Sequence, residues 1–211
     1  MAITTQQIKE LREATSAGVM DCRKALEQAG GDTAKALEFL RQQGLEKAAK
    51  RSERAATEGM VELYSHGNGR IGVMVEVNSE TDFVARSQAF REFAHEVALQ
   101  IAAFAPKYVK PEEIPTVELE QQQAEERAHA LAEGKPAQVI EKIVEGRVGK
   151  WLDEVCLLRQ RYVRDEDMQF EKLLQEKIVA LGENIVIRRF ARWEIGESTS
   201  TDSEGAPQNQ A

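Results

Sequence analysis

The sequence predicts an α+β protein in which a short all-helical segment precedes a core of sheet and helices. Apolar residues in the first part of the chain recur every three or four positions, as helices require. After residue 57 the period changes to two, which indicates β-strands, and helical spacing returns from about residue 87. We therefore expect a three-helix N-terminal module (1–44), a linker helix (45–57), a core domain (58–197) and a tail (198–211).

Residues 1–44 predict three short helices. Thr4 can cap the first helix, and Gln7, three residues later, completes a capping box. Gly18 separates this helix from a second, at about 20–29, and Asp32 is a natural N-cap for a third that runs to Gly44. Three helices of this size form a compact bundle that is marginally stable alone, because so small a core buries little area. The bundle resembles the ubiquitin-associated type of helical module.

The stretch from Arg41 to Ala56 is locally basic and periodic in alanine, which favours a solvated helix that links two domains. RNA binding is the alternative for this stretch. The whole chain, however, carries a net charge of −8. Because phosphate binding needs a clustered basic surface, we expect no nucleic acid among the partners of this protein.

The core should contain a three-stranded antiparallel sheet packed on helices. A β-type run at 60–64 is followed by a hairpin turn at 66–69, which is rich in glycine and asparagine, and by strict alternation of apolar residues at 71–77. Residues 184–195 predict the third strand.

Four further helices are expected in the core, at 87–104, 117–133, 137–161 and 167–181. The first should bury a stripe made of Phe90, Phe93, Val97, Ile101 and Phe104. The tail has no large apolar residue and should be disordered.

Nothing in the sequence predicts an enzyme, a metal site or a cofactor. The three histidines share no spacing, and the two cysteines form no metal-ligand pair, so we interpret the cysteines as reduced, packed thiols. No apolar run approaches membrane-spanning length, and the N-terminus lacks the pattern of a secretory signal. We therefore expect a cytoplasmic binding protein with no membrane partner.

Residues 76–86 form the most informative stretch of the chain. They predict the end of a strand that passes into a helix through an exposed corner, Thr81-Asp82-Phe83. At such a corner the aromatic ring of Phe83 can insert into a partner protein, and the carboxylate of Asp82 directly before it brings a negative charge to the same place. The alternative is that Phe83 is a buried first-turn residue that holds the next helix against the sheet.

These residues also resemble the second signature of the elongation factor Ts family. Residues 11–26 resemble the first signature, although Ser16 replaces the usual glycine and Val19 replaces a frequent methionine. Residues 158–165 and 181–190 resemble further family segments. The resemblance covers about residues 3–197 and is closest to a short form that has a single strand–helix core unit.

The resemblance implies a guanine-nucleotide exchange factor for the translation GTPase elongation factor Tu, which it would bind in the GDP-bound and nucleotide-free states. It implies that Phe83 inserts between helices of the GTPase domain, near the magnesium and phosphate side of the nucleotide site. The residues of this exchange contact are Thr81, Asp82, Phe83 and Val84.

The resemblance also implies that the N-terminal module touches the nucleotide-binding domain of the partner through Arg12, Val19 and Met20. The alternative for Val19 and Met20 is packing in the core of the bundle. Pairing of two single cores into a homodimer is a further hypothesis. The competing function is a helical protein-interaction adaptor with a dimerising core and no exchange activity.

Overall fold

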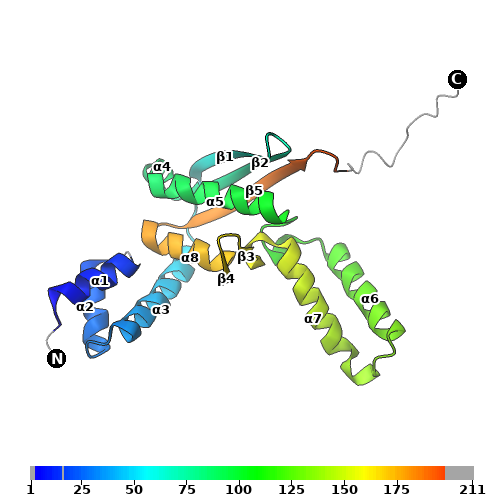
Figure 1. The fold of residues 1–211 in the computed structure, drawn as a ribbon, viewed down its shortest axis with the longest axis horizontal. Coiled ribbons are helices and arrows are strands. Elements are labelled where there is room, and N and C mark those ends of the chain that lie inside the picture. The colour runs from blue at the N-terminus through cyan, green and yellow to red at the C-terminus, as the bar shows by residue number, and fades with distance from the viewer. Residues whose placement is uncertain (1–2, 16, 198–211) are drawn as a thin grey trace.

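The computed structural model describes residues 3–15 and 17–197, and it forms a central body of sheet and helices with two helical arms (Figure 1). One arm is the N-terminal helical module, and the other is a hairpin of two helices from the middle of the chain. The prediction of an α+β fold is confirmed. The tail at 198–211 and Ser16 lie outside the described residues.

The N-terminal module consists of α1 (Thr5–Thr15), α2 (Val19–Gln28) and the first part of α3 (Thr33–Arg51). Both predicted caps are confirmed. The amide of Thr4 donates to Gln7 Oε1 over 3.0 Å and the amide of Gln7 donates to Thr4 Oγ1 over 3.2 Å, while Asp32 Oδ1 accepts from the amide of Lys35 over 3.1 Å. The buried core of the module is Leu11, Cys22, Ala25, Leu26, Ala36 and Leu40.

The third helix does not end at Gly44, and no separate linker helix follows it. Instead α3 continues without a break to Arg51. Gly44 lies against α8 (Phe170–Leu181), where a Cβ atom at residue 44 would come within 3.2 Å of Cγ2 of Val179. The glycine therefore serves close packing between two helices and does not stop the first one.

The sheet has the order β1-β2-β5 and is antiparallel throughout, as predicted. Its strands are β1 (Glu58–His66), β2 (Ile71–Ser79) and β5 (Ile185–Glu194). The β1–β2 turn uses positive φ angles of 60°, 56° and 85° at Gly67, Asn68 and Gly69. Such angles are favoured by glycine and asparagine, so the turn has the composition that its backbone requires.

Helices α5 (Gln88–Phe104) and α8 share one hydrophobic core with the sheet. Phe90, Phe93, Val97 and Ile101 of the predicted stripe are fully buried. The prediction for Phe104 is wrong, because 47% of this residue is exposed. Phe104 is the last residue of α5, and Ala105 turns the chain away with a left-handed φ of 45°.

The second arm is formed by α6 (Thr116–Ala132) and α7 (Ala137–Val155), and a short 3-10 helix (Pro111–Glu113) precedes it. The predicted helix at 137–161 is too long. The chain leaves α7 at Cys156, because its backbone pairs with Tyr108, whose carbonyl accepts from the amide of Leu157 over 2.9 Å.

A small hairpin that the sequence did not predict follows α7. After a 3-10 turn (Leu157–Arg159), β3 (Arg161–Tyr162) pairs with β4 (Asp165–Gln169). As a result α8 begins at Phe170, three residues later than expected.

Candidate functional site

The predicted corner is made of two successive capped turns. Strand β2 ends at Ser79, and Thr81 caps the one-turn helix α4 (Asp82–Ala85) by accepting from the amide of Val84 over 3.4 Å. Ser87 then caps α5, since its Oγ accepts from the amide of Phe90 over 3.3 Å. The chain between the two caps is held by local hydrogen bonds as a defined bend at the end of the sheet.

Phe83 projects from this bend into solvent. Its exposed fraction is 82%, so the alternative of a buried first-turn aromatic is wrong. The neighbouring Val84 is only 8% exposed and, with Ala85, joins the core beneath the sheet. The surface of the corner is therefore formed by Thr81, Asp82 and Phe83, whereas Val84 anchors it from inside.

The carboxylate of Asp82 is available beside the ring of Phe83. It forms an ion pair with Arg86, one helical turn later, in which Oδ2 lies 3.0 Å from Nη2. Both side chains are mostly exposed, and exposed pairs of this kind contribute about 0–1 kcal/mol. Asp82 can therefore leave Arg86 for another partner at little cost.

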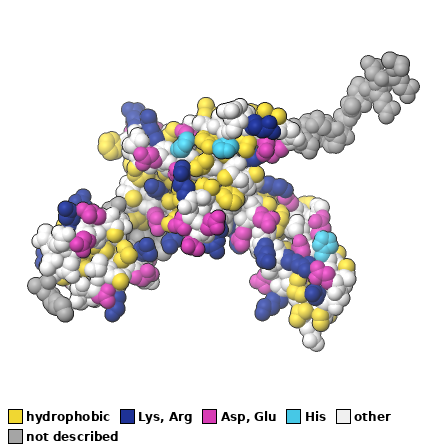
Figure 2. Space-filling model, viewed as in Figure 1, with side chains coloured by type: hydrophobic (Ala, Val, Ile, Leu, Met, Phe, Trp, Pro, Cys, Tyr) yellow, Lys and Arg dark blue, Asp and Glu magenta, His cyan; other side chains and the backbone are white. Residues whose placement is uncertain are grey.

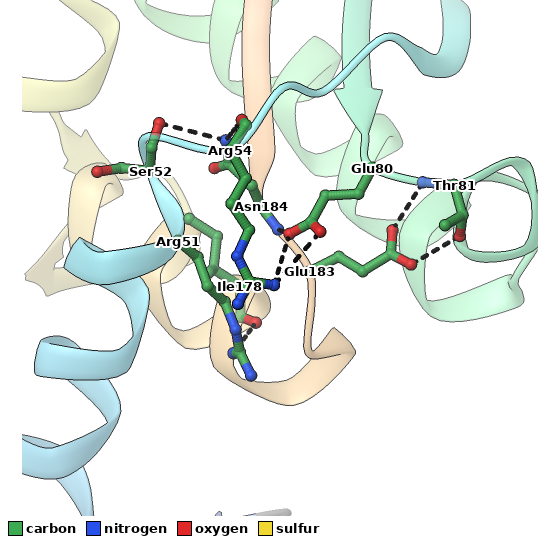
Figure 3. A network of polar contacts seen from close by, with 8 residues as sticks. All are labelled: Arg51, Ser52, Arg54, Glu80, Thr81, Ile178, Glu183 and Asn184. Atoms are coloured by element: carbon green, nitrogen blue, oxygen red, sulfur yellow. Dashed lines mark hydrogen bonds and ion pairs between the residues drawn. The ribbon is translucent and has the colours of Figure 1, made fainter.

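A residue that the sequence did not single out also belongs to this site. Glu183, in the turn between α8 and β5, accepts hydrogen bonds from the amide of Thr81 over 3.0 Å and from its hydroxyl over 2.6 Å (Figure 3). No local pattern could have found Glu183, because it lies 102 positions from Thr81 in the chain.

The N-terminal module leaves its predicted contact residues exposed. Val19 and Met20 open α2 with exposed fractions of 50% and 62%, and Arg12 is also exposed. Core packing of Val19 and Met20 is therefore wrong, since Leu11 and Leu26 fill the core in their place. The three predicted residues flank the turn between α1 and α2.

Charges on the face shown in Figure 2 are mixed, with Lys and Arg interspersed among Asp and Glu over both arms and the body. Within residues 3–15 and 17–197, no group of three or more His, Cys, Asp or Glu is placed to hold a metal ion. Cys22 and Cys156 are free thiols and buried, and burial raises the pKa of Cys156 to about 11. None of the described helices is both long and apolar enough to cross a membrane.

Comparison with known proteins places this chain in the class of the translation elongation factors. The family model "Elongation factor TS" matches residues 3–197. The chain is 55% identical to elongation factor Ts of Carboxydothermus hydrogenoformans over 96% of its own length and 93% of that protein. It is 56% identical to elongation factor Ts of Caldanaerobacter subterraneus subsp. tengcongensis, over 92% of the chain and 98% of that protein. The chain belongs to the elongation factor Ts family.

Proposed function

We propose that this protein is a guanine-nucleotide exchange factor for elongation factor Tu, and that it promotes GDP release by inserting the Asp82–Phe83 corner near the magnesium and phosphate site. The observation that supports this proposal most directly is the exposure of Phe83 on a capped bend in a member of this family. In this proposal the protein works in the cytoplasm as a binding protein. It forms no covalent intermediate and needs no cofactor, nucleic acid or membrane.

Exchange requires that the factor and GDP oppose one another on the same partner. If this protein weakens the binding of GDP to elongation factor Tu by a given ratio, GDP must weaken the binding of this protein by the same ratio. The protein should therefore bind both forms of elongation factor Tu and prefer the nucleotide-free form. Contacts that disturb the metal or the phosphates satisfy this condition directly.

The ring of Phe83 can supply the energy for such a disturbance. Burial of a phenylalanine side chain contributes about 1.5–3 kcal/mol, and this ring is almost entirely in water before binding. Magnesium in nucleotide sites is held by few protein ligands in addition to phosphates and waters, so a small shift of those ligands loosens it. The exposed carboxylate of Asp82 adds a negative charge that can take a new partner or disturb the water shell of the metal.

The N-terminal module supplies a second contact with the nucleotide-binding domain in this proposal. Val19 and Met20 offer exposed apolar surface, and Arg12 offers a cation at the end of α1. Two separated contacts fix the orientation of one protein on the other. The N-terminal contact would thus direct Phe83 to one place on the partner.

The proposal is tested by GDP release from purified elongation factor Tu loaded with a fluorescent GDP. Substoichiometric amounts of this protein should accelerate the release in the presence of excess unlabelled nucleotide. Release that is no faster than in its absence, together with measurable binding, would support the adaptor function instead. Absence of both binding and acceleration would reject both candidates.

We further propose that the protein forms a homodimer through the outer face of its sheet. Val61, Leu63, Met74 and Trp193 alternate outward on the three strands, and about half or more of each is exposed. A second copy can cover such a patch with the same residues, because the pairing is two-fold and self-complementary.

Native mass spectrometry at about ten micromolar, a concentration at which a dimer of micromolar or tighter affinity is well populated, tests the homodimer. Wild type should be dimeric, and Trp193→Lys should be monomeric. The matched control is Leu131→Lys, which places the same charge at an exposed leucine near the end of α6 and should stay dimeric. A monomeric wild type would reject the homodimer.

A further inference from the structure

Two carboxylates continue the pairing of β2 and β5 beyond the end of the backbone ladder. The last backbone pair is Ser79 opposite Ile185, so the next positions in register are Glu80 opposite Asn184 and Thr81 opposite Glu183. At these two positions a glutamate carboxylate accepts the hydrogen bond from the opposite backbone amide, as a backbone carbonyl does within the ladder. Glu80 Oε1 accepts from the amide of Asn184 over 2.6 Å, while Glu183 accepts from the amide of Thr81 (Figure 3).

Glu183 determines the orientation of the cap that holds the corner. Oε1 of Glu183 accepts the hydroxyl proton of Thr81 over 2.6 Å, which leaves the oxygen lone pairs of that hydroxyl for the amide of Val84. The carbonyl of Thr81 accepts from the hydroxyl of Ser79 over 3.0 Å. The amide, hydroxyl and carbonyl of Thr81 are thus all engaged, and two of these three groups are bound to Glu183.

The same turn also holds the segment that follows α3. Asn184, which is 2% exposed, donates from Nδ2 to the carbonyl of Arg54 over 2.7 Å, and Nη1 of Arg54 lies 3.4 Å from Oε2 of Glu80. Arg51 donates to the carbonyl of Ile178 in α8 over 3.3 Å. Figure 3 shows how these contacts join three chain segments at one place, with Thr81 at one edge of the network.

We infer that Glu183 is a positioning residue for nucleotide exchange, which holds the Thr81–Phe83 bend in the geometry that enters the partner. This inference rests on the proposed function. A segment that is ordered before binding loses less conformational entropy on binding, so more of the contact energy of Phe83 is available to displace the nucleotide. Glu183 acts through Thr81 and has no need to touch the partner.

The test compares Glu183→Ala and Glu183→Gln with wild type in stimulated GDP release. Glu183→Ala removes two hydrogen bonds to a charged acceptor and should slow the stimulated release about fivefold or more. Glu183→Gln keeps one acceptor oxygen, so its rate should fall between those of Ala and wild type. The matched control is Glu176→Ala on α8, which removes an exposed glutamate without a polar partner among the described residues and should leave the rate unchanged.

A double-mutant cycle with Phe83→Ala separates positioning from a general structural role. If Glu183 acts by orienting the bend, Glu183→Ala should have little further effect once the ring is absent. Multiplicative effects of the two changes would overturn the inference. Melting temperatures and circular dichroism check that each variant folds. If Glu183→Ala does not fold, Glu183→Gln takes its place in the double-mutant cycle.

The outcomes of this cycle also separate the inference from the proposed function. A normal rate for Phe83→Ala would refute the corner mechanism itself. A slow rate for Phe83→Ala beside a normal rate for Glu183→Ala would leave that mechanism intact and would reject the positioning role alone.

Discussion

Phe83→Ala should separate folding from function in this protein, because the ring is exposed in the free molecule. Less than a fifth of the residue is covered, whereas complete burial of a phenylalanine contributes about 1.5–3 kcal/mol. The free energy of unfolding should therefore fall by no more than about 0.5 kcal/mol. If the partner covers the whole ring, stimulated GDP release should slow by a factor of about 10 to 150.

The assay is the same fluorescent GDP release, with the variant and wild type at equal concentrations. Phe104→Ala is the control, since it removes a half-exposed phenylalanine at the C-terminal end of α5, away from the bend that precedes this helix. The control should keep the wild-type rate of release. Urea unfolding of all three proteins would show whether a slow rate reflects loss of folded protein.

Two results would contradict this role of Phe83. One is a Phe83→Ala protein that releases GDP as fast as wild type, because the ring would then do no work on the partner. The other is a large loss of unfolding free energy in this variant, which would mean that the ring packs inside its own subunit.

Three further predictions concern other residues. Asp82→Ala should slow stimulated release less than Phe83→Ala does; complete loss of release with normal binding would mean that the charge, and not the ring, displaces the nucleotide. Met20→Ala should weaken binding to elongation factor Tu several-fold, by calorimetry, at an unchanged melting temperature, because its side chain is exposed. Burial and a hydrogen bond to Glu96 raise the pKa of Tyr162 to about 12. The neutral phenol therefore stabilises the fold fully below pH 10, and this contribution is lost as the pH rises toward 12. In urea unfolding, the stability difference between wild type and Tyr162→Phe should shrink over that interval, and a constant difference would contradict the pKa shift.

Local sequence patterns were sufficient for the parts of the fold that depend on neighbouring residues. The caps at Thr4 and Asp32 require only a side-chain oxygen and an amide three positions away. The β1–β2 turn requires residues that accept positive φ angles, and the alternation of β2 identifies its buried face. The Thr81–Phe83 corner is predicted for the same reason, since a strand pattern and a helical pattern follow one another there.

Contacts between distant segments decided what such patterns could not. Gly44 is a natural helix end in isolation, yet it lies inside α3, where Val179 of α8 fills the space that a side chain would occupy. The end of α7 coincides with pairing of Cys156 with Tyr108, some 48 positions away (156 − 108).

The candidate site also depends partly on local sequence patterns and partly on contacts between distant segments. Neighbouring residues alone are enough to predict that a carboxylate and an aromatic ring follow one another at a bend. The packed fold then places Phe83 in solvent and Val84 in the core, since that depends on how α4 lies on the sheet. It also brought Glu183 to Thr81, because the antiparallel register of β2 and β5 places those two positions opposite each other. A hydrogen bond between residues 102 positions apart produces no local pattern in the sequence, so it becomes visible only in the folded arrangement of the strands.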